Sequence, residues 1–129
     1  MGKYLQMITY KGKEIMFMNT AGVSEEGGIE AWQEMKRELL RNQDIHLILV
    51  DGSNIAIAPA SVSKAKDAAS VIRQDPRNRV AFVGLTALQK STAQLIAKGI
   101  HVEAQFFKTQ EEGKEWLVAE ANRPLQRPG

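Results

Sequence analysis

The chain has 129 residues and a net charge of +2, from 17 basic and 15 acidic side chains. A chain of this length predicts one domain, which buries roughly two thirds of the unfolded surface on folding. The absence of cysteine excludes disulfides, thiol chemistry and zinc sites with cysteine ligands. The small charge excess argues against nucleic acid as a partner.

The two ends of the sequence predict where the protein is found and where its domain stops. Residues 1–6 lack the apolar core of a signal peptide, and no apolar run approaches the length of a membrane span. We therefore expect a cytoplasmic protein. Residues 123–129 show no periodicity and contain two prolines, so they predict a flexible tail after a domain that covers residues 1–122.

The first elements predict a hairpin followed by a helix. Residues 4–10 and 14–18 are rich in strand-forming side chains and are separated by a short turn, which is typical of an antiparallel pair. Ser24 is a good N-cap, with acidic residues in the first turn. The helix has an apolar face of Ile29, Trp32, Met35 and Leu39 and a polar face of Gln33, Glu34, Arg37 and Arg41.

The central strand is the strongest signal. Residues 47–50 are four consecutive aliphatics without alternation, which indicates a parallel strand covered on both faces. Asp51, Ser53 and Asn54 follow it, at the carboxyl edge where open α/β sheets bind ligands. These three residues are therefore candidates for a binding site. The interpretation that we favour for Asp51 is that its carboxylate caps the backbone of the Gly52-Ser53 turn.

Two further strands and three further helices complete the pattern. An apolar loop over 55–63 runs into a helix that ends before Asp75-Pro76, and residues 80–83 form a strand. Thr86 opens the next helix in a capping box with Gln89, and Gly99 is its expected stop. Residues 102–106 alternate as an edge strand should, and Thr109 with Glu112 caps the final helix.

This ββαβαβαβα order predicts a single α/β domain with a five-stranded mixed sheet and helices packed on it. The simplest sheet follows the chain order, with the first strand antiparallel and the rest parallel. The first and last strands are then edges. An exposed edge near Tyr4 or Val102 is a candidate site for pairing into a homodimer.

At this point the chain resembles a known group. The element order, the strand from Leu47 to Asp51 with its Ser/Asn turn, the Val80–Gly84 strand and the Phe106–Thr109 segment are similar to those of STAS domains. The resemblance is closer to the stand-alone SpoIIAA-like proteins, which border on the Sec14-like lipid carriers. It covers about residues 4–121. It implies a bacterial protein with a regulatory or protein-interaction role and an unidentified protein partner.

In the anti-sigma-factor antagonists of this group, an Asp-Ser-Ser segment at a helix start carries a phosphorylated serine. Counted from Asp51, that segment falls on residues 59–61, where Pro59 and Ala60 depart from the pattern. Ser61 and Ser63 remain as candidate phosphorylation or partner-binding residues, because a phosphate at a helix start gains from free N–H groups. Both serines are also ordinary N-cap residues, which is the interpretation we favour.

No catalytic signature is present in the sequence. His46 and His101 are the only histidines, and nothing in their spacing requires a metal site. The chain has no nucleophile elbow and no glycine-rich phosphate loop. We therefore expect no enzyme activity, cofactor or metal.

Two functions remain open. The first is a non-enzymatic regulatory or protein-interaction module. The alternative is a carrier of a small apolar or anionic ligand, or of a lipid. Such a ligand could occupy the edge from Asp51 to Asn54, with Thr86 as a further candidate. It could also occupy an interior made pliable by four methionines, which are Met7, Met16, Met18 and Met35.

Overall fold

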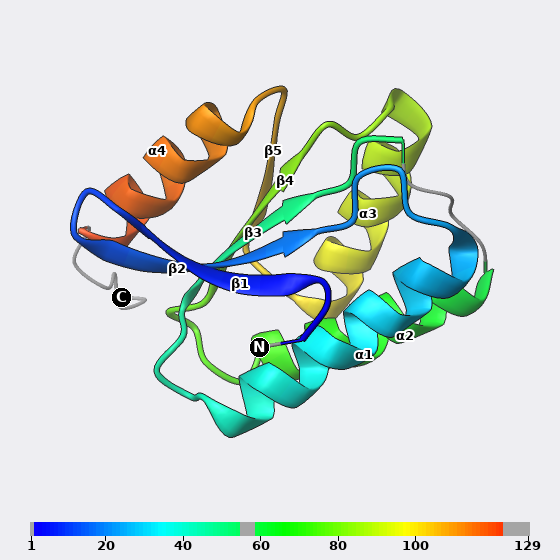
Figure 1. The fold of residues 1–129 in the computed structure, drawn as a ribbon, viewed down its shortest axis with the longest axis horizontal. Coiled ribbons are helices and arrows are strands. Elements are labelled where there is room, and N and C mark those ends of the chain that lie inside the picture. The colour runs from blue at the N-terminus through cyan, green and yellow to red at the C-terminus, as the bar shows by residue number, and fades with distance from the viewer. Residues whose placement is uncertain (1, 55–58, 123–129) are drawn as a thin grey trace.

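A computed structural model describes residues 2–54 and 59–122. Residues 55–58 of the predicted apolar loop and the tail predicted over 123–129 lie outside the described residues, whereas residues 59–63 of that loop are helical. Figure 1 shows the fold as two layers of helices on either side of one twisted sheet.

The sheet has the predicted order and directions. It runs β1-β2-β3-β4-β5, with β1 antiparallel to β2 and every other neighbouring pair parallel. A turn at Lys11 and Gly12, both with positive φ, joins β1 to β2. The strands are β1 (Leu5–Tyr10), β2 (Lys13–Asn19), β3 (Leu47–Asp51), β4 (Arg79–Val83) and β5 (Ala104–Phe107). The sequence prediction of sheet topology is therefore confirmed.

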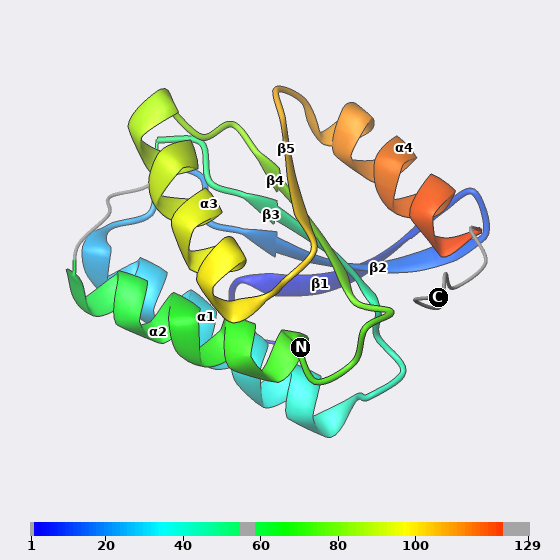
Figure 2. The same cartoon turned by 180° about the vertical axis from the view of Figure 1, so that it is seen from behind.

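The helices divide unequally between the two faces. The helices are α1 (Glu25–Arg41), α2 (Pro59–Ile72), α3 (Ala87–Ile100) and α4 (Gln110–Ala121). The first three lie on one face of the sheet and α4 lies alone on the other, as the view from behind also shows (Figure 2). Each parallel connection thus crosses over through one helix.

The central strand β3 contributes to both cores. Ile48 and Val50 belong to the cluster beneath α1 and α2, whereas Leu47 and Leu49 belong to the cluster beneath α4. All five residues of β3 are buried. The alternation follows from the pleat of a strand, which sends successive side chains to opposite faces. The prediction of a strand covered on both faces is confirmed.

Three helix starts follow the predicted capping, whereas the end of α3 and the start of α2 differ from prediction. Ser24 accepts from the N–H of Gly27, and Thr86 and Thr109 form the expected capping boxes. Helix α3 continues past Gly99 to Ile100, and His101 supplies the left-handed residue (φ 63°) that ends it. Helix α2 starts at Pro59, a residue suited to a first helical turn because it lacks the N–H.

Two side chains lie where the sequence pattern did not place them. Glu34, predicted on the polar face of α1, is 8% exposed. Its Oε1 accepts hydrogen bonds from the backbone N–H groups of Tyr4 and Leu5, which explains why the carboxylate tolerates burial. Met7, predicted in the interior, is 36% exposed, because it lies on the edge strand.

Candidate functional site

Asp51 is the structural centre of the carboxyl edge. Its Oδ1 accepts from the N–H of Ser53 at 3.0 Å and its Oδ2 accepts from Nε2 of Gln110 at 2.8 Å. Its backbone oxygen accepts from both the N–H and the hydroxyl of Thr20, at 2.9 and 2.7 Å. One residue thus joins the ends of β2 and β3 to the start of α4.

The same contacts set the charge of Asp51. Burial opposes ionisation, but hydrogen bonds from Ser53 and Gln110 outweigh it, so that the pKa of Asp51 is lowered. The carboxylate is therefore negative at neutral pH. Its contact with Ser53 is the turn-capping interaction favoured for Asp51 from the sequence.

The loops after three strands meet around Ser53. The Ser53 oxygen accepts from the N–H of Gly22 at 2.7 Å, and the N–H of Gly52 donates to Val83 at 3.0 Å. A Cβ on Gly84 would lie 1.9 Å from Oγ of Ser53, so this glycine is needed where the loops cross. Asn54 follows with a positive φ of 56° and is exposed.

The other candidate residues lie at helix starts. Thr86 is exposed, and its hydroxyl accepts from the N–H of Gln89 as a cap. Ser61 and Ser63 both lie inside α2, so the expectation that they cap this helix is wrong. Ser61 is 5% exposed and Ser63 is exposed. The structure therefore brings Asp51 and Ser53 together and leaves Ser63 on the surface.

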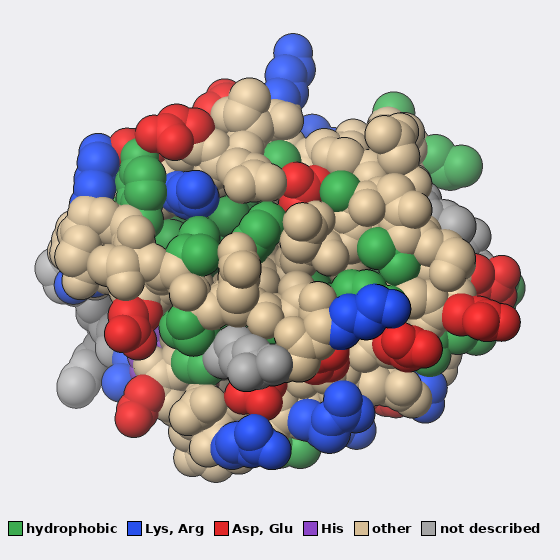
Figure 3. Space-filling model, in the orientation of Figure 1, with side chains coloured by type: hydrophobic (Ala, Val, Ile, Leu, Met, Phe, Trp, Pro, Cys, Tyr) green, Lys and Arg blue, Asp and Glu red, His purple; other side chains and the backbone are tan. Residues whose placement is uncertain are grey.

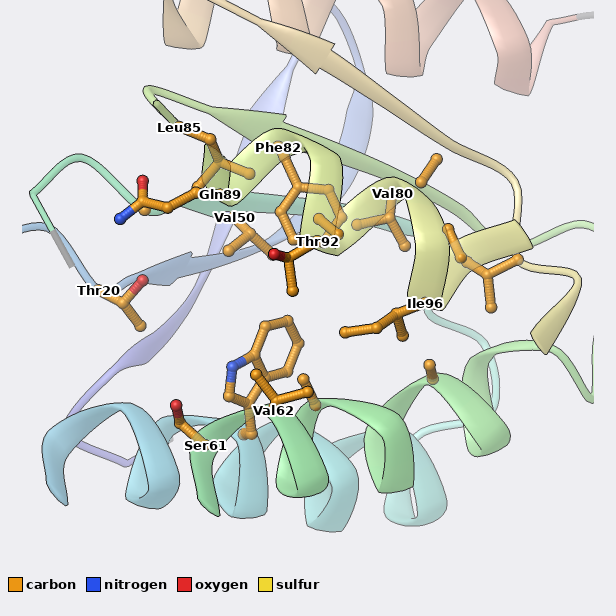
Figure 4. A pocket seen from close by; sticks show the side chains of 18 of the residues that line it. Thr20, Val50, Ser61, Val62, Val80, Phe82, Leu85, Gln89, Thr92 and Ile96 are labelled. Atoms are coloured by element: carbon orange, nitrogen blue, oxygen red, sulfur yellow. The ribbon is translucent and has the colours of Figure 1, made fainter. Parts of the chain in front are cut away.

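An apolar hollow lies beneath α3. It is a cavity of about 100 Å³ between α3, α2 and the face of the sheet that carries Val50, Val80 and Phe82. Figure 4 shows Val62 of α2 and Ile96 of α3 pointing into the space from opposite sides. Trp32 of α1 also lines it. This space we call the α3 cavity.

The α3 cavity exists because α3 packs loosely on the sheet. None of the residues of α3, all of which the structure describes, is buried. The side chains of α3 that line the cavity recur at helical spacing, and several of them are small. They are Gln89, Thr92, Ala93, Ile96 and Ala97. Opposite them, Ala65 and Ala69 of α2 are small as well, which leaves space between the helices.

Polar groups are few in the cavity and gather at one end. Figure 4 shows Thr20, Ser61 and Gln89 near the carboxyl edge of the sheet, and Thr92 facing the space from α3. The Thr20 hydroxyl already donates to Asp51. Among the described residues, no buried side-chain nitrogen or oxygen lacks a hydrogen-bond partner. The remaining lining is apolar, so the cavity favours an apolar occupant.

The methionines do not form the cavity. Met16, Met18 and Met35 are fully buried in the core beneath α1, and none of them lines the α3 cavity. These three methionines therefore fill a core, which is the commoner role of methionine, and do not shape a pocket.

The two histidines lie apart from the carboxyl edge. Nδ1 of His46 is 2.9 Å from Oδ1 of Asn78 and 3.6 Å from Oδ2 of Asp75, and His101 is exposed at the end of α3. In the described part of the chain, no three His, Asp or Glu residues are placed to hold a metal ion. Nor does any described helix have the length and apolar character needed to cross a membrane.

The surface shows charges of both signs. In the space-filling view, apolar side chains reach the surface on the side formed by the β1–β2 hairpin, with acidic and basic side chains interspersed around them (Figure 3). This mixture agrees with a net charge of only +2. It gives no broad basic surface on this face.

The element order, the sheet topology and the arrangement of helices together define a SpoIIAA-like α/β fold. The chain is similar in structure to an uncharacterised protein of the DUF3478 family from Shewanella loihica PV-4, whose SpoIIAA-like fold is known from a crystal structure at 2.25 Å resolution. The TM-score is 0.61 with 16% sequence identity, over 88% of this chain and 91% of that one. No protein-family model matches the sequence, and no curated protein matches it significantly.

Proposed function

We propose that this chain is a non-enzymatic binding protein of the bacterial cytoplasm that holds a small apolar ligand in the α3 cavity. The observation that carries this proposal is the apolar lining beneath a helix with no buried residue. Ligand sites in proteins are usually concave and mostly apolar, with a few polar groups that orient the ligand. The α3 cavity has this composition.

The energetics of packing support the same proposal. Interiors are close-packed, and the side chains around a void lose dispersion contacts that a filled core would provide. Helix α3 is fixed at its start by the Thr86 capping box and at its end by the left-handed His101, while its middle spans the cavity. An apolar molecule in the cavity would restore contacts to Ile96, Phe82 and Trp32.

The proposal that the protein is not an enzyme rests on how its polar groups are used. The carboxylate of Asp51 is bonded to Ser53 and Gln110, and the Thr86 hydroxyl caps α3. These groups hold the fold together at the edge where a reaction would be expected. A binding role requires no further chemistry from them.

The direct test is to fill the cavity with a larger side chain of the protein itself. Ala93 lines the cavity, whereas Ala87 of the same helix is exposed and does not. We expect 1-octanol to bind the wild type and Ala87→Phe with similar affinity in calorimetric titrations, and to lose measurable binding to Ala93→Phe. Equal binding to both variants, or no binding to the wild type, would contradict the proposal.

A second candidate function, a protein-interaction module, is supported by the outer surface of α3. Leu88 and Leu95 are 79% and 73% exposed, and their spacing of seven residues places them on one side of the helix. Exposed leucines close together are a feature of contact surfaces. Its test is affinity capture from the host with the wild type and with Leu88→Gln/Leu95→Gln, where a specific partner is retained by the wild type only.

The SpoIIAA-like resemblance adds a phosphorylated serine to this second candidate. Ser63 is exposed on α2 and a kinase can reach it, whereas Ser61 is 5% exposed and requires local opening. If the switch exists, we expect phosphate on Ser63 in protein isolated from its host, and weaker partner binding by Ser63→Asp. Mass spectrometry of the intact protein and its peptides decides the first point.

A further inference from the structure

A second hollow adjoins the α3 cavity. It is a cleft of about 420 Å³ at the amino edge of the sheet, between the ends of α2 and α3 and the starts of β4 and β5. Ile72, Ala97 and Val102 line both the cleft and the α3 cavity. The apolar space beneath α3 is therefore adjacent to this second space, which we call the charged cleft.

Cations outnumber anions in the charged cleft. Its lining includes Arg73, Arg79 and Lys98 together with Asp75 and Glu103. The Asp75 carboxylate already accepts from the guanidinium of Arg77, at 2.8 and 3.1 Å, which neutralises one of the two acids. The imidazole ring of His101 belongs to the same lining.

Two of the cations are available to a ligand. Arg73 and Lys98 are exposed, and neither forms an ion pair with a carboxylate among the described residues. Arg79 is more constrained, because its Nε lies 3.3 Å from Glu120 and its Nη1 donates to the backbone oxygens of Pro76 and Asn78. Arg73 follows the end of α2 and Lys98 lies in the last turn of α3, on the two sides of the cleft.

No charged side chain among the described residues lines the α3 cavity itself. The Asp51 carboxylate does not face this space, because it accepts from Gln110 of α4, the helix on the other face of the sheet. The hydroxyl groups of Thr20 and Ser61 already have partners. The cations that an anionic group of a ligand would contact therefore lie in the charged cleft and not at the carboxyl edge.

We infer that the ligand of the α3 cavity is an amphipathic anion, with its apolar chain beneath α3 and its carboxylate or phosphate group in the charged cleft beside Arg73 and Lys98. This inference rests on the proposed function, since it names the chemical class of the ligand for the same cavity. Charged hydrogen bonds to a guanidinium or an ammonium are stronger than neutral ones, which gives the anion its advantage.

Three probes that carry an alkyl chain of similar length test the anionic group separately from the apolar ligand site. They are 1-octanol, octanoate and octyl phosphate. In calorimetric titrations of the full chain we expect at least one of the two anions to bind about tenfold more tightly than 1-octanol. Arg73→Gln/Lys98→Gln should remove this advantage and leave 1-octanol binding unchanged. The matched control Lys66→Gln/Lys90→Gln removes the same charge, also from α2 and α3, at residues that line neither space, and should keep the advantage.

The outcomes distinguish failure of this inference from failure of the proposed function. If all three probes bind the wild type equally, the cavity binds ligand but the inference about the anionic group is overturned. Equal loss of the advantage in both double variants also overturns it, because net charge would then explain the preference. If no probe binds the wild type, the proposed function fails and this inference fails with it. The relative affinity of octanoate and octyl phosphate shows which anionic group fits the cleft.

Discussion

The carboxylate of Glu34 accepts a hydrogen bond of 3.0 Å from the backbone N–H of Leu5, at the first residue of edge strand β1. The preceding oxygen, that of Tyr4, accepts from Asn19 of β2, so the alternation of an antiparallel pair turns the Leu5 N–H toward the open edge. Glu34 of helix α1 thus accepts the first backbone N–H that this edge would otherwise leave unpaired. Lys3 and Lys11 flank the strand with charge, which opposes edge-to-edge pairing of two copies.

Replacing Glu34 by alanine is expected to destabilise the protein. The change leaves two backbone donors, those of Tyr4 and Leu5, without their partner and removes a buried contact. We expect a loss of about 1–3 kcal/mol in the free energy of unfolding, measured in urea. Glu34→Gln keeps a carbonyl acceptor and should lose less. A smaller effect of alanine than of glutamine would show that the bonds do not hold the edge strand.

Two glycines predict opposite effects of the same substitution. Gly84 has a φ of 77°, and a Cβ there would overlap Oγ of Ser53, so Gly84→Ala should destabilise the protein by about 1–3 kcal/mol. Gly99 lies inside α3 with open space around it, and Gly99→Ala should stabilise the protein by about 0.5–1 kcal/mol. Thermal unfolding of the two variants checks both signs. A shift of the melting temperature in the same direction for both would contradict the different roles given to the two glycines.

Two leucines on different helices predict a large and a small effect. Leu117 of α4 is fully buried against the sheet, whereas Leu95 of α3 is 73% exposed. Leu117→Ala should cost about 2–5 kcal/mol of unfolding free energy, and Leu95→Ala less than about 0.5 kcal/mol. Denaturant titration gives both values. Similar costs would mean that α4 is not the main cover of its face of the sheet.

The pH dependence of stability should include a contribution from Asp75. Hydrogen bonds from the Arg77 guanidinium lower the pKa of Asp75 from 3.8 to about 2, against the opposing effect of burial. A lowered pKa in the folded state stabilises the protein above pH 3.8, and this stabilisation disappears as the pH falls through 2. We expect the difference in unfolding free energy between wild type and Asp75→Asn to shrink by up to about 2 kcal/mol over that range. A difference that does not change with pH would exclude the contribution.

The sequence predicted the sheet well because its signals are local. The aliphatic run over 47–50 requires cover on both faces, and the Thr86 and Thr109 capping boxes each depend on a residue three positions away. The strand order followed from short crossovers between consecutive strands. In each case the partners are near neighbours in sequence, so a pattern within one segment was enough.

The misplaced residues depend on partners far away in the sequence. Glu34 is buried because its acceptor oxygen meets N–H groups about thirty positions earlier, and helical periodicity carries no information on that contact. Gln110 reaches Asp51 across 59 positions. The positions of Ser61 and Ser63 differed from prediction because α2 begins at Pro59, earlier than a serine cap requires.

The α3 cavity was not predicted because it arises from a gap in packing between elements. The small residues Ala65, Ala69, Ala93 and Ala97 all fit an ordinary helical stripe, and such a stripe predicts contact with the sheet. Only their meeting across two helices leaves space. The repeated alanine on facing helices is the signal that could have indicated it.

The strands lie in the sheet in the same order as in the sequence, and this has a consequence for biosynthesis. Each strand docks beside the one that left the ribosome before it, so the sheet can grow stepwise from the β1–β2 hairpin without waiting for a distant segment. The face that carries Leu49 and Ala81 receives its helix last, since Leu117 lies in α4. Until α4 has been translated, that face is open to water, and we expect nascent chains that end before residue 110 to be the species that chaperones bind.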